Sequence, residues 1–149
     1  MRRITTFAVA MLLSIGTLLA HEPVKNIIYL IGDGMGLSSV SMMQLVNKYE
    51  PTIFDKAENI ALQKTYSADN RVTDSAAAGS ALSTGYKTNN GMIGVTPDSL
   101  PKTNLLEYFE QAGKPTGIVV TYPVTNATPA AFVAHVPHRN MEDEIATYY

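Results

Sequence analysis

A carboxylate between two glycines is the first feature of this 149-residue chain that could do chemistry. Asp33 directly follows the apolar run 26–31, and ligands of open α/β sheets gather beyond the carboxyl ends of the strands. The flanking glycines let a metal ion or a bulky ligand approach the carboxylate. Mg²⁺ would use such an oxygen, and Zn²⁺ could share it. Taken alone, the residues favour a simpler interpretation, an aspartate that shapes a turn or caps the next helix.

A serine at an expected helix start is the second feature. Ser75 follows Asp74 and precedes a run of small residues, so its hydroxyl is expected beside helix N-terminal amides, which attract phosphoryl groups. No histidine lies near it in the sequence, which leaves metal coordination as the route to a serine nucleophile. Spacing alone favours the alternative, in which Asp74 or Ser75 is an ordinary N-cap.

A threonine and an arginine form the third feature. Thr128 lies just past a second apolar run, where it is an N-cap or a ligand of a hard metal ion. Arg139 follows eleven residues later, after an expected helix over 130–136, and its planar guanidinium could hold two phosphate oxygens. The alternative is a solvated arginine at a helix end. His135 and His138 are too few for a complete zinc site and are expected to be structural or surface groups.

The elements that must position these residues indicate an α/β fold. Apolar runs without alternation predict buried strands of a parallel sheet. Capping and turn residues delimit the expected helices between them. In chain order we expect a strand at 26–31, a helix over 37–49, a short strand at 59–66, a helix over 75–82, a helix capped by Thr103 and stopped by Gly113, a strand at 117–121, and a helix opened by Thr128 and Pro129.

Composition excludes several classes of protein. With 46% hydrophobic and 16% charged residues, the chain is neither disordered nor fibrous. A formal net charge of −2 argues against nucleic acid as a partner. The absence of cysteine excludes disulfides, thiolate metal sites and cysteine nucleophiles.

The first 20 residues have the layout of a secretory signal peptide. Arg2 and Arg3 precede an apolar stretch, and cleavage is expected after Ala20, which leaves residues 21–149. The alternative is a retained N-terminal membrane anchor. Export predicts a secreted protein of the bacterial periplasm or cell surface, with no stable membrane span after cleavage.

Four ordered motifs together resemble the alkaline phosphatases. The resemblance covers nearly all of 25–139 and is carried by 29–36, 72–80, 83–91, and 127–131 with Arg139. The resemblance implies a three-layer α/β/α sandwich with a largely parallel central sheet, here incomplete. It also implies metal-dependent hydrolysis of phosphate monoesters through a phosphoserine intermediate, with two Zn²⁺ and one Mg²⁺, and a homodimer of the full-length enzyme.

The resemblance further implies a role for each matching residue. Ser75 would be the nucleophile and a ligand of the second Zn²⁺. Asp33 would bridge that Zn²⁺ and the Mg²⁺, and Thr128 would bind the Mg²⁺. Arg139 would hold the non-bridging phosphate oxygens, oriented by Asp74.

The chain departs from the family pattern in three respects. Ser80 replaces the usual threonine, and Asn126 stands where Asp or His is frequent, which bears on occupancy of the third metal site. The family's remaining Asp, Glu and His ligands have no counterpart after Arg139, because 142–144 is expected to be a solvated helix start. The chain also stops in what is expected to be the middle of a helix.

We therefore expect 21–149 to be the N-terminal portion of the catalytic domain, and inactive alone. The alternatives are a phosphodiesterase or related hydrolase of the same superfamily, and a non-catalytic exported module that binds phosphate or metal.

Overall fold

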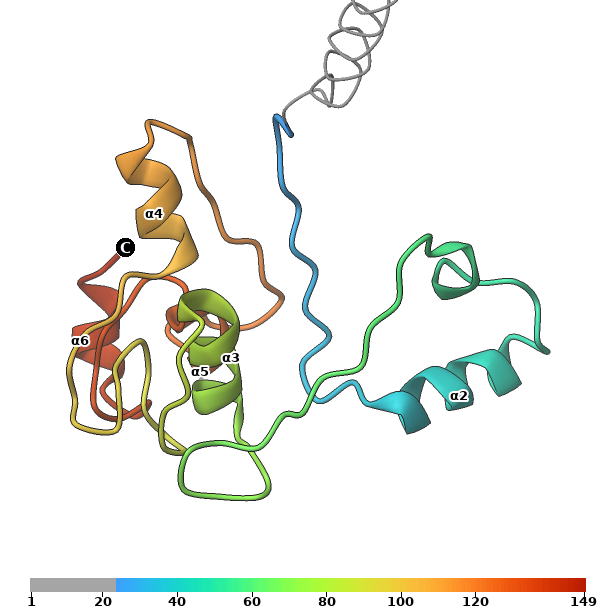
Figure 1. Cartoon of the computed structure of the whole chain (residues 1–149), viewed down its shortest axis with the longest axis horizontal. Helices are drawn as coiled ribbons and strands as arrows, with labels where there is room; N and C mark the ends of the chain where they lie inside the picture. Colours follow the sequence, from blue (N-terminus) through green and yellow to red (C-terminus); the bar gives the residue numbers. More distant parts are fainter. Residues whose placement is uncertain (1–23) are drawn as a thin grey trace, which may run out of the picture. The chain divides into compact units, whose positions relative to one another are not determined.

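The computed structural model describes residues 24–149, drawn in colour in Figure 1. The expected signal peptide, residues 1–20, lies outside the described residues. The chain divides after Ile31 into two compact units. The described part of the first, 24–31, is an exposed segment without helix or strand. The second unit, Gly32–Tyr149, carries all the candidate site residues.

The first helix of the second unit, α2 (Leu37–Val46), is followed by a short 3₁₀ helix, η1 (Phe54–Lys56). The expected end at Tyr49 is wrong by three residues. Lys48 and Tyr49 have φ angles of 52° and 59°, and left-handed residues do not continue a right-handed helix. No residue of α2 is buried.

Helix α3 (Ser75–Thr84) confirms the helix expected over 75–82 and extends it by two residues. Asp74 is its N-cap, with the carboxylate accepting from the Ala77 N–H at 2.9 Å. Gly85 ends the helix in the left-handed conformation, at φ 77°, which glycine adopts without steric cost. Residues that directly flank the helix therefore define both of its ends, although the expected end was two residues early.

Helix α4 (Leu105–Gln111) begins one residue later than expected. Asn104, rather than Thr103, is the N-cap, because Asn104 and Glu107 form a reciprocal capping box. The Glu107 carboxylate accepts from the Asn104 N–H at 2.8 Å, and the Asn104 side chain accepts from the Glu107 N–H at 3.0 Å. The chain turns away at Gly113, as expected, with φ 69°.

The last two helices also differ from expectation. Helix α5 (Ala127–Ala130) is capped by Asn126, so Thr128 lies inside the first turn and is not the N-cap. The helix expected over 130–136 is wrong, because that stretch continues as turns and a bridge. Helix α6 (Glu142–Ala146) confirms the acidic helix start, but it ends at Ala146, so the chain does not stop inside a helix.

No residue of 24–149 belongs to a β-strand, and the described backbone pairing is limited to antiparallel bridges joining Ile93 to Val136 and Val95 to Pro101. The segments 26–31, 59–66 and 117–121 are irregular. Their apolar side chains are not buried as expected, since Leu30 is 87% and Val119 98% exposed. A buried strand requires a hydrogen-bonded neighbour and a covering layer, and these segments show neither in 24–149. The central parallel sheet stays a prediction.

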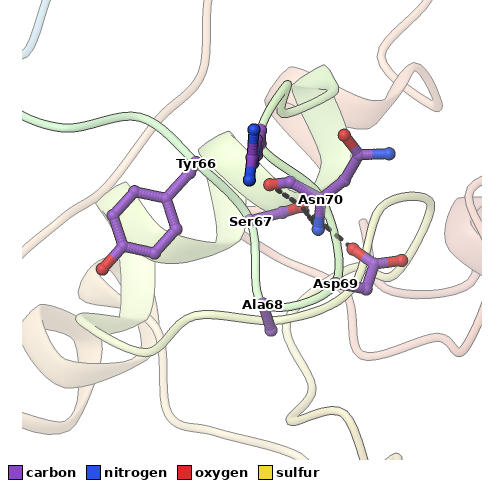
Figure 2. Close-up of a pocket in the computed structure, with 6 residues that line it drawn as sticks. Tyr66, Ser67, Ala68, Asp69 and Asn70 are labelled. Carbon is purple, nitrogen blue, oxygen red and sulfur yellow. Dashed lines mark hydrogen bonds between the residues drawn. The ribbon is translucent and has the colours of Figure 1, made fainter.

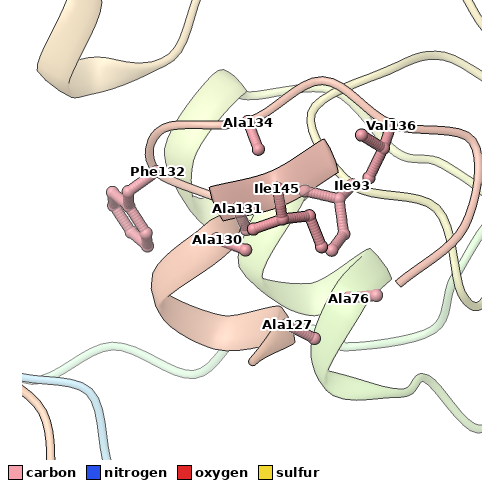
Figure 3. Packing of buried hydrophobic residues seen from close by; sticks show 9 residues of the cluster. All are labelled: Ala76, Ile93, Ala127, Ala130, Ala131, Phe132, Ala134, Val136 and Ile145. Carbon is pink, nitrogen blue, oxygen red and sulfur yellow. The ribbon is translucent and has the colours of Figure 1, made fainter. Parts of the chain in front are cut away.

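The hydrophobic core lies where α3 packs against α5 (Figure 3). A Cβ built on Gly79 of α3 would come within 2.9 Å of the Ala131 Cβ, so the backbones approach more closely than any larger residue permits. The buried cluster consists of Ala76, Ile93, Ala127, Ala130, Ala131, Phe132, Ala134, Val136 and Ile145.

Among residues 24–149, none of the helices has the length and apolar character that a membrane span requires.

Candidate active site

Asp33 lies in a tight turn that presents its carboxylate. The Met35 N–H donates to the Gly32 carbonyl at 3.1 Å, and Gly34 has a φ of 67°, which glycine adopts readily. The two carboxylate oxygens accept from different hydroxyls. Ser75 Oγ donates to Oδ1 at 3.3 Å, and Thr128 Oγ1 donates to Oδ2 at 2.5 Å. The structure thus brings together the three residues expected to bind metal.

Ser75 is the first residue of α3, directly after the N-cap Asp74. The first amides of a helix lack intrahelical partners and point toward its N-terminus, where the helix dipole is positive. The Ser75 hydroxyl is therefore in a setting that favours negative charge. It is partly exposed, so a substrate can reach it.

Thr128 reaches Asp33 because α5 lies close against α3. The Thr128 carbonyl oxygen is 3.6 Å from a Cβ built on Gly79, so the small residue controls this approach. Thr128 itself is 9% exposed, and its hydroxyl donates to Asp33. Packing in the core thereby fixes one of the candidate metal ligands.

Asp74 connects the nucleophile helix to the candidate phosphate-binding arginine. One carboxylate oxygen caps α3 through Ala77, as described above. The other accepts from the Gly91 N–H at 3.0 Å and from Arg139 NH1 at 3.2 Å. The Arg139 backbone N–H also donates to the Gly91 carbonyl at 2.7 Å. Arg139 is thus paired with Asp74 and is not a freely solvated side chain.

Asn90 lies within the motif 83–91, but the sequence assigned it no role at the site. Its side-chain oxygen accepts from the Asp74 N–H at 3.1 Å, and its NH₂ group donates to the Val72 carbonyl at 2.9 Å. The available signal was the pair Asn90-Gly91, a frequent turn dipeptide. It indicates a turn but not what the side chain binds.

The segment preceding Asp74 borders an open pocket lined by 66–71 (Figure 2). The buried Ser67 hydroxyl donates to the Asp69 carboxylate at 2.9 Å and accepts from the Asn70 N–H at 3.1 Å. The Asn90 N–H also donates to the Asp69 carboxylate, at 2.9 Å. These two bonds hold the pKa of Asp69 below its usual value, with the Asn90 N–H the larger cause. The pocket wall is therefore tied to the same Asn90 turn.

The two histidines within 24–149, His135 and His138, make hydrogen bonds to groups outside the candidate site. In His135, Nδ1 lies 2.8 Å from the Gly94 carbonyl and Nε2 lies 2.8 Å from Glu107 Oε1. His138 Nδ1 accepts from the Asn140 N–H at 3.2 Å. These contacts agree with the structural or surface role expected for both.

The donor atoms gathered at Asp33 are all oxygens, namely one carboxylate and two hydroxyls. Hard oxygen donors suit Mg²⁺. Within 24–149 there is no group of three or more His, Cys, Asp or Glu residues that could hold a metal ion. The described residues thus fit a partial metal-binding set.

In comparison with known proteins, the sequence pattern of the alkaline phosphatases matches residues 24–148. The chain belongs to the alkaline phosphatase family. Among its curated relatives, alkaline phosphatase 3 of Bacillus subtilis is 43% identical over 87% of the chain and 29% of the relative. Repressible alkaline phosphatase of Saccharomyces cerevisiae is 41% identical over 87% of the chain and 24% of the relative.

Solved structures give the same result. The alkaline phosphatase of the Antarctic bacterium TAB5 superposes with a TM-score of 0.72 at 41% identity, covering 76% of this chain and 33% of that enzyme. A variant of the TAB5 enzyme with Mg bound in its M3 site matches equally well. The chain is therefore related to alkaline phosphatases in fold, although it spans only about a quarter to a third of the length of these relatives.

Proposed function

We propose that this chain supplies the nucleophile, the arginine and part of the metal-binding set of a metal-dependent phosphomonoesterase. One observation carries the proposal. The Ser75 hydroxyl, at the N-terminus of α3, is hydrogen-bonded to Asp33, while the neighbouring residue Asp74 is paired with Arg139. The nucleophile thus lies at an anion-binding helix end, and a cation for phosphate oxygens is paired with the residue that precedes it.

In the proposed reaction, Ser75 Oγ attacks the phosphorus of a phosphate monoester. The Oγ–P bond forms, the bond between phosphorus and the ester oxygen breaks, and the alcohol or phenol leaves with a proton. Water then cleaves the phosphoserine and releases inorganic phosphate. Asp33 orients the Ser75 hydroxyl through its hydrogen bond, and the accepting carboxylate favours removal of the hydroxyl proton.

Arg139 binds the phosphoryl oxygens that do not react. Its guanidinium uses NH1 on Asp74, and the other N–H groups make no hydrogen bond within 24–149. They are free to donate to two oxygens of a monoester, and the α3 amides add partial positive charge. Preorganised donors of this kind stabilise charge that develops on the transferring group.

A metal set is part of the proposal. Asp33 and Thr128 would hold Mg²⁺, and Asp33 and Ser75 would contribute to one of two Zn²⁺ sites. When bound, these ions lower the pKa of a coordinated hydroxyl or water and stabilise the leaving oxygen. Mg bound in the TAB5 variant supports the magnesium component. Asn126 is the residue whose departure from the family pattern bears on occupancy of the third metal site. Its side-chain oxygen accepts from the Ala127 N–H at 2.9 Å and so caps α5.

The remaining expectations complete the proposal. The full-length protein, meaning this chain together with the further length that its relatives have, acts on phosphomonoesters outside the cytoplasm and forms a homodimer. We expect the 149-residue chain alone to lack measurable turnover, because the oxygen donors gathered at Asp33 would supply only part of the proposed metal set.

Hydrolysis of an aryl phosphate in the presence of Zn²⁺ and Mg²⁺ tests the function. We expect turnover by the full-length protein and its loss in Ser75→Ala, with Ser38→Ala on the exposed face of α2 as the matched control. A phosphorylated Ser75 peptide, trapped by acid and identified by mass spectrometry, would show the intermediate. Absence of serine-dependent turnover contradicts the proposal, and faster hydrolysis of a bis-aryl phosphate would identify a phosphodiesterase instead.

A further inference from the structure

The Asn90 side chain pairs with the segment before the nucleophile in the manner of a neighbouring β-strand. Its oxygen accepts from the Asp74 N–H and its NH₂ group donates to the Val72 carbonyl. In an extended backbone the C=O of one residue and the N–H of the second residue after it point to the same side. A carboxamide offers one acceptor and one donor at matching positions, so it satisfies both groups at once.

The backbone of the Asn90-Gly91 turn holds the same site from a second direction. The Gly91 N–H donates to the Asp74 carboxylate, and the Gly91 carbonyl accepts from the Arg139 N–H. A Cβ at Gly91 would lie 3.4 Å from the His138 ring, and the φ of 85° disfavours other residues. The turn thus lies between Asp74 and Arg139, in contact with both.

We propose that Asn90 is a positioning residue for phosphoryl transfer, which fixes the Ser75 hydroxyl and the Arg139 guanidinium relative to each other through Asp74. The inference rests on the proposed function. Asn90 touches neither the substrate nor the reacting atoms. Its effect is transmitted because the Asp74 backbone starts α3, while the Asp74 carboxylate holds the arginine.

Replacing Asn90 by alanine removes its two side-chain hydrogen bonds and leaves the backbone of the turn unchanged. Asn90 has no positive φ, so alanine fits its backbone conformation, and the Gly91 contacts stay in place. The Asp74 N–H and the Val72 carbonyl lose their partners, and segment 72–74 gains freedom. A displacement of about 1 Å at a reacting group can cost on the order of 100-fold in rate.

The neighbouring Asn89 provides a matched control. It is also partly buried, and its side chain makes no hydrogen bond within 24–149. Asn90→Asp provides a second variant, because a carboxylate keeps the acceptor for the Asp74 N–H but loses the donor to Val72. The three variants separate the loss of the hydrogen bonds from the loss of an asparagine in this loop.

Steady-state kinetics of the full-length protein with an aryl phosphate test the proposal. In Asn90→Ala we expect kcat to fall about 10–100-fold with KM changed less than about threefold, since positioning acts on the chemical step. Asn90→Asp should lie between Asn90→Ala and wild type, and Asn89→Ala should match wild type within about twofold.

Amide hydrogen exchange of the same preparations supplies a readout that needs no activity. We expect the Asp74 N–H to exchange faster in Asn90→Ala than in wild type or Asn89→Ala. Faster exchange with unchanged kcat would show a structural tether only and overturn the positioning role, as would unchanged exchange. If the wild-type protein has no turnover, the proposed function fails, and with it the catalytic role; exchange then reports whether the tether exists.

Discussion

The Arg139 guanidinium donates a hydrogen bond to the Asp74 carboxylate at 3.2 Å, although 65 positions separate the two residues in the chain. The same carboxylate caps α3 directly before Ser75. One side chain therefore sets both the start of the nucleophile helix and the direction of the candidate phosphate-binding group. A change at Asp74 should affect stability and catalysis by separable routes.

Replacement of Asp74 by alanine and by serine separates these routes. Serine is a good N-cap but cannot pair with arginine, whereas alanine does neither. We expect Asp74→Ala to cost about 0.5–2 kcal/mol of stability and Asp74→Ser much less. Both should lower kcat/KM of the full-length protein about tenfold through the loss of arginine orientation. Thermal unfolding and initial rates are the measurements; a wild-type rate in Asp74→Ser would exclude an orienting role.

Gly79 is expected to be intolerant of even one added methyl group. A Cβ there would lie 2.9 Å from the Ala131 Cβ, so Gly79→Ala must push α5 away from α3. Overpacking of this kind lowers stability by about 1–3 kcal/mol. Replacing glycine by alanine within a helix raises stability by about 1 kcal/mol at most, so we expect a net loss. Gly117→Ala, with open space around the added atom and no positive φ, is the control. Denaturant unfolding should show a lower midpoint for Gly79→Ala alone.

Ser80 is expected to matter for stability through a buried hydrogen bond. Ser80 is 1% exposed, and its hydroxyl accepts from the Gly94 N–H at 2.8 Å and donates to the Met92 carbonyl at 3.3 Å. Ser80→Ala leaves the buried Gly94 donor unpaired, at a cost of about 1–3 kcal/mol. Ser80→Thr keeps the hydroxyl and should retain most of the stability.

Thermal unfolding measures this difference, with Ser41→Ala as the matched control. The Ser41 hydroxyl donates to the Leu37 carbonyl on the exposed α2, so its loss should change stability by no more than about 0.5 kcal/mol. Equal melting temperatures for Ser80→Ala and wild type would contradict the prediction.

The pocket wall at Asp69 is expected to loosen in acid. The Asn90 N–H and the Ser67 hydroxyl favour the charged carboxylate, which lowers the pKa of Asp69 in the folded chain below its ordinary value of 3.8. These bonds therefore stabilise the fold above pH 3.8, and their contribution is lost as the pH falls below 3.8 through the folded pKa.

NMR titration of the Asp69 carboxyl carbon and the Asn90 amide measures this effect. Both signals should titrate together below pH 3.8. In Ser67→Ala the pKa of Asp69 should move part of the way back, since the Asn90 N–H remains. A titration at or above the ordinary value in the wild-type chain would contradict the assigned contacts.

Local signals in the sequence predicted the parts of the site that depend on neighbouring residues. The position of Ser75 at a helix start, with Asp74 as cap, follows from a bond that reaches only three residues along the chain. Where two good caps stood side by side, as at Thr103 and Asn104, the choice depended on the partner Glu107, and the expected start was one residue early.

The relation among distant residues was decided by the tertiary structure alone. Asp33 meets Ser75 across 42 positions and Thr128 across 95. Motif resemblance implied that these residues act together, but no local preference brings them into contact. Asn90 shows the same limit, because an Asn-Gly pair predicts a turn without indicating that its amide binds Val72 and Asp74.

The sequence by itself thus determined the family, the start of the nucleophile helix and the residue types available for the chemistry. Only the tertiary structure determined which of those residues meet. The physical reason is that helix caps are satisfied within one turn, whereas the contact of Thr128 with Asp33 requires α5 to pack on α3 at Gly79.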